Sequence, residues 1–161
     1  MRKAARPIPE GYHTVTPYLT IRDAARAIEF YKRAFGAQEL MRMPGPGGRI
    51  MHAEIKIGDS VIMIGDIFPG MPGRSARSLG GSPIGLHLYV EDADGFVQRA
   101  IAAGATETMP LADQFWGDRY GKVADPFGME WGVAEHVRDV SEEDMMRAAQ
   151  QHSQEMHQGM H

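Results

Sequence analysis

Two histidines and two glutamates in the sequence have the chemistry to act on a small molecule: His52, Glu54, His87 and Glu130. A glutamate beside a histidine can serve as a general base with an acid partner, and burial among apolar groups would raise the pKa of its carboxyl. The same four groups are also adequate ligands for Zn²⁺, Ni²⁺ or Fe²⁺. Their role depends on the elements that position them.

Alternation along the predicted strands places these four side chains on one surface of a sheet. In the segment 49–57, His52 and Glu54 alternate with apolar residues that we expect to pack on helices, namely Met51, Ala53, Ile55 and Ile57. A solvated polar face of an antiparallel sheet would give the same alternation. However, the surface is also expected to carry Tyr18, Met63 and Tyr89, and that mixture favours the lining of a ligand pocket.

The chain contains an internal repeat with an offset of 69 residues, from Tyr18 to His87. Each copy opens with an alternating segment that reaches an Asp suited to cap a helix. Helices are predicted at 24–35 and 93–103, each followed by a glycine, and strands at 38–43, 49–57, 60–65, 106–109, 119–124 and 129–135. The pattern predicts an α+β fold of two tandem βαβββ modules. Their strands would form a curved, mostly antiparallel eight-stranded sheet around a pocket, with the helices outside.

These elements divide the chain into a single domain at 1–140 and a C-terminal helix with a frayed tail at 141–161. Module one covers about 14–67, a Gly/Pro/Ser-rich flexible linker covers 68–83, and module two covers about 84–137. In the linker, Arg74 and Arg77 are either solvated or able to close over an anionic ligand. We expect the tail to be disordered. As an alternative, three of its histidines could bind a metal ion, namely His152, His157 and His161.

Composition narrows the class of protein. There is no cysteine, which excludes disulfides and thiolate chemistry and fits a cytoplasmic protein. The net charge is −4, and acidic and basic residues are interspersed along the chain without a basic patch. We therefore expect no nucleic-acid partner. We find neither a signal peptide nor an apolar run long enough to cross a membrane.

Several short stretches, taken in order and with their spacing, resemble the vicinal oxygen chelate superfamily. They are Ala-Ile-Glu-Phe-Tyr at 27–31, Asp-Pro-Phe-Gly at 125–128, and the segments 16–19, 51–54, 57–61 and 116–119. That superfamily includes glyoxalase I, fosfomycin and bleomycin resistance proteins and extradiol dioxygenases. The likeness spans about Thr14 to Val140 and is closer to the PhnB-like branch.

The resemblance implies positions for a divalent metal and shows that the usual ligands are missing. In metal-using members, four inward His, Gln or Glu side chains hold the cation, and those positions fall at Thr16, Met63, Gly85 and Gly132. Glycine and methionine cannot supply imidazole or hard oxygen ligands. We therefore expect no cofactor at that place. A displaced centre built from His52, Glu54, His87 and Glu130 stays open.

Two functions remain after this comparison. The first is a binding protein whose pocket needs only ring surfaces and a few polar groups. Its expected ligand contacts, besides Met63, are Tyr18, Tyr89, Phe115 and Trp116, with Arg119 anchoring a carboxylate or phosphonate. The alternative is a lyase or isomerase that uses an inward Glu/His pair. Superfamily members often dimerise, so we expect a homodimer.

Overall fold

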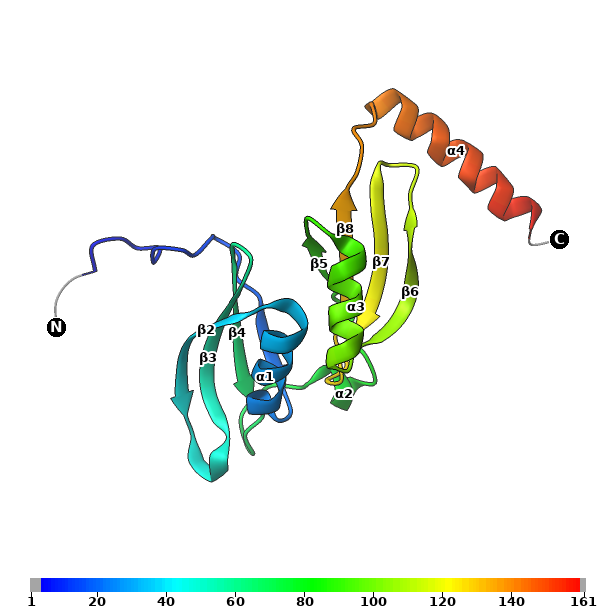
Figure 1. Ribbon diagram of the computed structural model, residues 1–161. Coiled ribbons are helices and arrows are strands. Elements are labelled where there is room, and N and C mark those ends of the chain that lie inside the picture. The colour runs from blue at the N-terminus through cyan, green and yellow to red at the C-terminus, as the bar shows by residue number, and fades with distance from the viewer. Residues whose placement is uncertain (1–3, 160–161) are drawn as a thin grey trace.

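Each copy of the repeat folds into a four-stranded sheet with a helix against one face (Figure 1). The computed structural model describes residues 4–159. The first module contains β1 (Tyr18–Ile21), α1 (Ala24–Phe35), β2 (Gln38–Pro44), a 3₁₀ turn (Pro46–Gly48), β3 (Ile50–Ile57) and β4 (Ser60–Asp66). The second contains β5 (Leu86–Tyr89), α3 (Ala93–Ala103), β6 (Thr106–Asp113), β7 (Asp118–Ala124) and β8 (Glu130–His136).

The two sheets have the same topology. Their strand orders are β1-β4-β3-β2 and β5-β8-β7-β6. In each sheet the first strand pairs in parallel with the last, and the other pairs are antiparallel. The predicted α+β class and the two tandem βαβββ modules are therefore confirmed.

The sequence predicts one eight-stranded sheet around a pocket, but within the chain the two four-stranded sheets remain separate. Instead, α1 and α3 pack against each other between the sheets (Figure 1). One face of each sheet is covered by this helical layer. The other face points away from it, and we call this the open face of each sheet.

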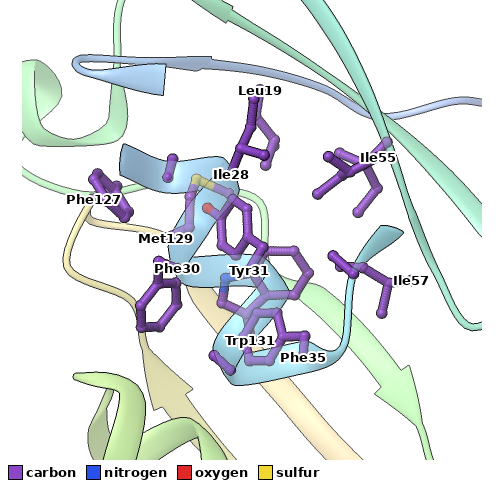
Figure 2. Packing of buried hydrophobic residues seen from close by; sticks show 14 of the residues in the cluster. Leu19, Ile28, Phe30, Tyr31, Phe35, Ile55, Ile57, Phe127, Met129 and Trp131 are labelled. Carbon is purple, nitrogen blue, oxygen red and sulfur yellow. The ribbon is translucent and has the colours of Figure 1, made fainter. Parts of the chain in front are cut away.

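A single hydrophobic core joins the modules through α1 (Figure 2). The apolar face of α1 carries Tyr31 and Phe35, which both lie against Trp131 of β8. The ring centroids are 5.4 Å apart for Tyr31 and 4.8 Å apart for Phe35. Phe35 also stacks on Phe96 of α3 at 5.4 Å. Trp131 has no exposed surface. Burying these large rings stabilises the association by several kcal/mol, on the order of 1.5–3 kcal/mol for each large side chain.

A carboxylate inside this core ties α1 to the turn before β8. Asp125 accepts hydrogen bonds from the Tyr31 hydroxyl at 2.6 Å and from Trp131 Nε1 at 2.9 Å. It also accepts from the backbone amides of Phe127 and Met129 at 2.8 and 3.0 Å. Burial, followed by the charge and hydrogen bond of Asp125, raises the pKa of Tyr31 well above its usual value. All the polar groups of this buried network are paired, which is the condition for it to be tolerated in the core.

The two helices begin differently from one another. Asp92 caps α3 as predicted, because its side chain accepts from the Gly95 amide. Asp23 does not cap α1: it has a left-handed φ of 70° and no side-chain cap. Asp66, at the end of β4, accepts from the amides of Asp23 and Ala24 instead. The expected cap at Asp23 was therefore wrong, because a carboxylate distant in the sequence satisfies the same donors.

The segment 68–83, predicted as a linker, joins the two modules. It contains a short helix, α2 (Ala76–Leu79), which is capped by the buried side chain of Ser75. Gly128 lies so close that a Cβ there would be 3.1 Å from the Arg77 amide, and its φ of +91° also favours glycine. Arg74 and Arg77 themselves are exposed.

The predicted C-terminal helix is present as α4 (Glu142–Gln158), which begins with a Ser141 cap on the Asp144 amide. It is largely exposed, with Met145, Ala148 and Ala149 only partly buried. His152 lies against Phe115, with ring centroids 5.8 Å apart. His161 lies outside the described residues. No helix in the described part of the chain is long and apolar enough to cross a membrane.

Candidate functional site

The open face of the first sheet carries the first predicted Glu/His pair. His52 Nε2 lies 3.2 Å from Glu54 Oε1, and Tyr12 donates its hydroxyl hydrogen to Glu54 Oε2. The His52 ring also lies 5.7 Å from that of Tyr18. Strand register places Glu54 opposite Met63 and Lys56 opposite Val61.

Alternation breaks at the start of β3. Met51, expected on the helix side, is 38% exposed, whereas its neighbour Ile50 is 3% exposed. A register shift between Met43 and Pro44 of β2 causes this change. Its effect is to turn the first residue of the strand inward, where its amide donates to Asp66.

A hollow of about 560 Å³ lies between this face and the N-terminal segment. We call it the Glu54 hollow. It is lined by residues 7–9, 12–14 and 16, together with Glu54 and Met63. Thr16 and Met63, two of the four positions where superfamily members would carry metal ligands, therefore line one hollow. Neither residue supplies an imidazole or a carboxylate.

Glu54 is more acidic than an ordinary glutamate. The hydrogen bond from Tyr12 is the largest cause of its lowered pKa. Burial acts in the opposite direction and raises the pKa, whereas the hydrogen bond and charge of His52 lower it further. Conversely, burial and the bond to Glu54 raise the pKa of Tyr12 to about 12. The raised carboxyl pKa expected for a general base is therefore wrong for Glu54, because hydrogen-bond donors stabilise its charged form more than burial destabilises it.

A continuous row of rings begins on the open face of the second sheet and extends over the loop between β6 and β7 to α4. His87 lies 4.8 Å from Tyr89 and stacks on Tyr120 at 5.3 Å. From Tyr120 the row continues to Trp116 at 6.0 Å and then to Phe115 at 5.0 Å. Its last contact, between Phe115 and α4, is the one with His152. We call these six residues the ring row: His87, Tyr89, Tyr120, Trp116, Phe115 and His152.

A buried carboxylate holds two members of the ring row, Tyr89 and Trp116, in place. Asp118 accepts from the Tyr89 hydroxyl at 3.1 Å and from Trp116 Nε1 at 3.2 Å. His136 Nδ1 lies 2.8 Å from its other oxygen, and His136 Nε2 lies 2.8 Å from Asp139. Burial alone would raise the pKa of Asp118, but these three donors lower it. The two aspartates raise the pKa of His136, with Asp139 contributing most.

The other predicted carboxylate, Glu130, is already paired. Lys122 Nζ lies 3.0 Å from one of its oxygens, and the Thr108 hydroxyl donates to the other at 3.2 Å. Its side chain is 44% exposed. Lys122 occupies the position on β7 that Glu54 occupies on β3, because Lys122 is opposite Gly132 as Glu54 is opposite Met63. The second sheet thus presents a neutral pair where the first presents a carboxylate.

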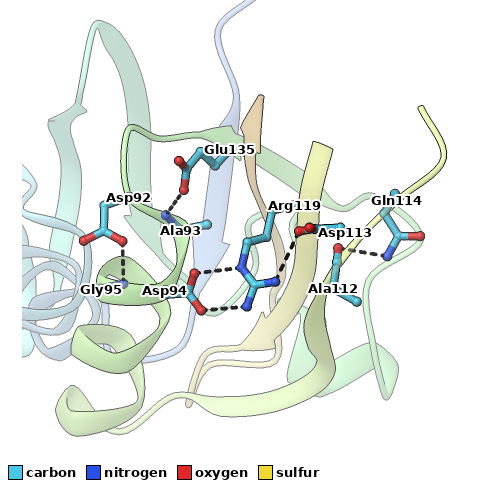
Figure 3. A network of polar contacts seen from close by, with 9 residues as sticks. All are labelled: Asp92, Ala93, Asp94, Gly95, Ala112, Asp113, Gln114, Arg119 and Glu135. Carbon is cyan, nitrogen blue, oxygen red and sulfur yellow. Dashed lines mark hydrogen bonds and ion pairs between the residues drawn. The ribbon is translucent and has the colours of Figure 1, made fainter. Parts of the chain in front are cut away.

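Arg119 lies on the side of the second sheet that faces α3 (Figure 3). Its neighbour Tyr120, a member of the ring row, points to the other side. The Nε and Nη2 of Arg119 donate to the two oxygens of Asp94 on α3 at 2.7 and 2.8 Å, and Nη1 donates to Asp113 at 3.3 Å. Figure 3 also shows Glu135 bonded to the first amide of α3. Arg119 therefore holds the helix to its sheet, and its expected role as an anchor for an anionic ligand is not supported.

The four predicted acids and imidazoles do not converge within one chain. His52 and Glu54 lie on one open face, whereas His87 and Glu130 lie on the other. Among residues 4–159, no group of three or more His, Asp or Glu side chains is arranged to hold a metal ion. Gly85 and Gly132, the remaining expected ligand positions, have no side-chain donor. A Cβ at Gly132 would lie 2.9 Å from His87 Nδ1, so the ring occupies that space.

The sequence analysis did not predict several residues that lie on or beside these faces. Tyr120 could have been found, since it alternates with Lys122 in the predicted strand 119–124. Asp118 and His136 lie just beyond the predicted strand ends. Tyr12 precedes the first module and carries no periodic signal, so only the fold shows that it reaches Glu54.

Comparisons with known proteins agree with this architecture. The model of the Glyoxalase/Bleomycin resistance protein/Dioxygenase superfamily matches residues 12–133. The chain belongs to this superfamily.

Among its relatives is the uncharacterized protein Rv0887c of Mycobacterium tuberculosis, 47% identical over 137 residues, which cover 83% of this chain and 81% of the relative. A solved structure from Arabidopsis thaliana, the At5g48480 gene product, is 30% identical with a TM-score of 0.64 and covers 77% of this chain and 99% of its own. The PhnB protein from Bacillus cereus is 17% identical, with a TM-score of 0.59 over 76% of this chain and 99% of its own, and thus shares the fold.

Proposed function

We propose that this glyoxalase-like protein binds a small organic molecule non-covalently, holding its planar part against the ring row. The ring row is the observation that carries this proposal. Tyr89 is 67% exposed although its hydroxyl is fixed by Asp118, so a large apolar surface is held rigid and presented outward. Rigid aromatic surfaces of this kind are typical of ligand sites, and each ring–ring contact contributes about 0.5–1.5 kcal/mol beyond its buried area.

The geometry favours binding over acid–base catalysis by the predicted pairs. Glu54 is held in its charged form by two hydrogen bonds, which makes it a weak base. Glu130 is half exposed and neutralised by Lys122. The lyase or isomerase alternative therefore has no carboxylate with the expected properties. The usual metal positions do not fit a divalent cation, because two are glycines and a third is methionine.

The proposal includes a second copy of the chain that closes the site. Within one chain the two open faces point away from the shared helical layer, so neither can cover the other. A twofold axis would bring the first sheet of one copy over the second sheet of its partner, and the same contact would form twice. Exposed apolar groups support this, because Tyr18 is 51% exposed and Met41 and Met43 line the edge beside Glu54 and His52. Since cysteine is absent, we also propose a cytoplasmic location.

Tryptophan fluorescence tests the binding proposal, because Trp116 lies in the ring row while Trp131 is fully buried. Planar heteroaromatic compounds should quench Trp116 and raise the melting temperature. Tyr120→Leu should weaken binding about threefold to tenfold, since it removes the ring stacked on His87. Leu79→Ala, an apolar truncation on exposed α2, is the control and should change nothing. Equal binding by Tyr120→Leu and the wild type would contradict the proposed role of the ring row.

Light scattering tests the second copy separately. We expect a particle of twice the chain mass, and Met41→Glu should convert it to a monomer because it places a charge on the edge of the open face. Ligand binding should weaken in the same variant. A monomeric wild type with unchanged ligand affinity would show that one chain is sufficient and would remove the second copy from the proposal.

A further inference from the structure

The Glu54 hollow differs from the ring row in its charge. Its floor contains one carboxylate, which is only 20% exposed. Within residues 4–159, Glu54 forms no salt bridge with any lysine or arginine, and its two partners are a phenol and an imidazole. Because its pKa is lowered, the group is ionised at neutral pH. A negative charge in a hollow of about 560 Å³ thus has a phenol and an imidazole, but no lysine or arginine, as its partners.

Nearby charged groups do not remove this charge. Lys56 is two residues further along β3, where it lies opposite Gln38 and Val61. The corresponding place in the second module holds the Lys122–Glu130 pair, which is neutral as a unit. The difference between the two modules therefore leaves Glu54 without a lysine or arginine partner, beside Met63 and Thr16.

Aromatic residues lie near the carboxylate. The hydroxyl of Tyr12 bonds directly to Glu54, and the Tyr18 ring lies 5.7 Å from the ring of His52. Pro7, Ile8 and Pro9 complete an apolar wall opposite the sheet. A carboxylate among ring faces and apolar walls is the environment that attracts an organic cation, through charge and through cation–π contacts. The same environment repels anionic ligands.

We propose that the Glu54 hollow binds a positively charged nitrogen of the ligand, an ammonium or amidinium group, while the ring row holds its planar part. The inference rests on the proposed binding function and specifies its ligand class as cationic aromatic compounds. Tyr12 acts here as a positioning residue, because it orients the carboxylate and closes the N-terminal segment over it. The two half-sites are combined when the first sheet of one copy meets the second sheet of its partner.

Three compounds with one ring skeleton and different charges provide the test: 9-aminoacridine as a cation, acridone as a neutral compound and acridine-9-carboxylate as an anion. Calorimetry on the purified full chain should show the cation binding about tenfold more tightly than acridone, and the anion more weakly than both. The preference for the cation should fall as salt is added, because charge attraction is screened.

Variants locate the preference. In Glu54→Gln, 9-aminoacridine and acridone should bind with about equal affinity, because the charge that attracts the cation is gone. The affinity for acridone itself should equal that of the wild type. Glu107→Gln, which removes an exposed carboxylate on β6, is the matched control and should keep the wild-type preference. Tyr12→Phe should weaken binding of the cation and leave that of acridone unchanged, because it removes the hydroxyl that orients the carboxylate.

The outcomes separate the two proposals. Equal affinity of the wild type for 9-aminoacridine and acridone would overturn the cation site and leave ring binding intact. If none of the three compounds binds or quenches Trp116, both proposals fail. A cation preference that survives in Glu54→Gln would place the charge recognition elsewhere and refute the role of this hollow. If that variant does not fold, the comparison of the three compounds on the wild type still tests whether a cation is preferred.

Discussion

Removing one hydroxyl from the core should loosen the attachment of the two modules. In Tyr31→Phe, Asp125 loses the shortest of its four hydrogen bonds, at 2.6 Å, and keeps Trp131 and two backbone amides. A hydrogen bond to a charged group is worth about 1.5–3 kcal/mol, and little water can replace it in a fully buried position. We therefore expect the free energy of unfolding to fall by about 1.5–3 kcal/mol, or the melting temperature by about 2–4 °C for each kcal/mol.

Urea denaturation followed by far-ultraviolet circular dichroism measures this loss, with all proteins at one concentration so that any dimer contributes equally. Tyr89→Phe is the matched control. Its hydroxyl also donates to a carboxylate, Asp118, but the residue is 67% exposed and water can take over the bond. We expect this control to lose less than about 1 kcal/mol. Equal losses in both variants would refute the argument that the Asp125 network holds α1 to the second module.

Three further changes have distinct expected results. Gly132→Ala should weaken the binding of planar ligands while the chain still folds, because its methyl group would lie 2.9 Å from His87 Nδ1 and 3.1 Å from the Tyr120 ring; unchanged affinity in a calorimetric titration would contradict this. Arg119→Gln should lower the melting temperature slightly and leave ligand affinity unchanged, since Arg119 holds Asp94 on the other side of the sheet; a loss of affinity would restore it to the ligand site. The pKa of His136 is raised above its ordinary value of 6.5, so its contribution to stability is fully present below that pH and is lost as the pH rises through the raised pKa. The stability difference between about pH 6 and about pH 8 should therefore shrink in His136→Gln, and an unchanged difference would assign it to other groups.

Local patterns predicted the elements well. Both helices of the repeat begin and end where the apolar periodicity and the following glycines placed them, at 24–35 and 93–103. The open-face residues His52 and Glu54 of β3 and Met63 of β4 were also predicted, because side chains alternate along paired strands, but the break in alternation at Ile50 and Met51 was not. Errors arose where a distant residue intervened, as when Asp66 replaced Asp23 as the cap of α1.

The sequence by itself determined which side chains share a face, since that depends on a period of two residues along each strand. It could not determine whether the two faces meet. That depends on how α1 packs, and Tyr31 and Phe35 bury their rings against Trp131 of the other module rather than only against their own sheet. Because hydrophobic burial has no intrinsic direction, only the complete tertiary packing places the helices between the sheets and leaves Glu54 and the ring row on separate, outward surfaces.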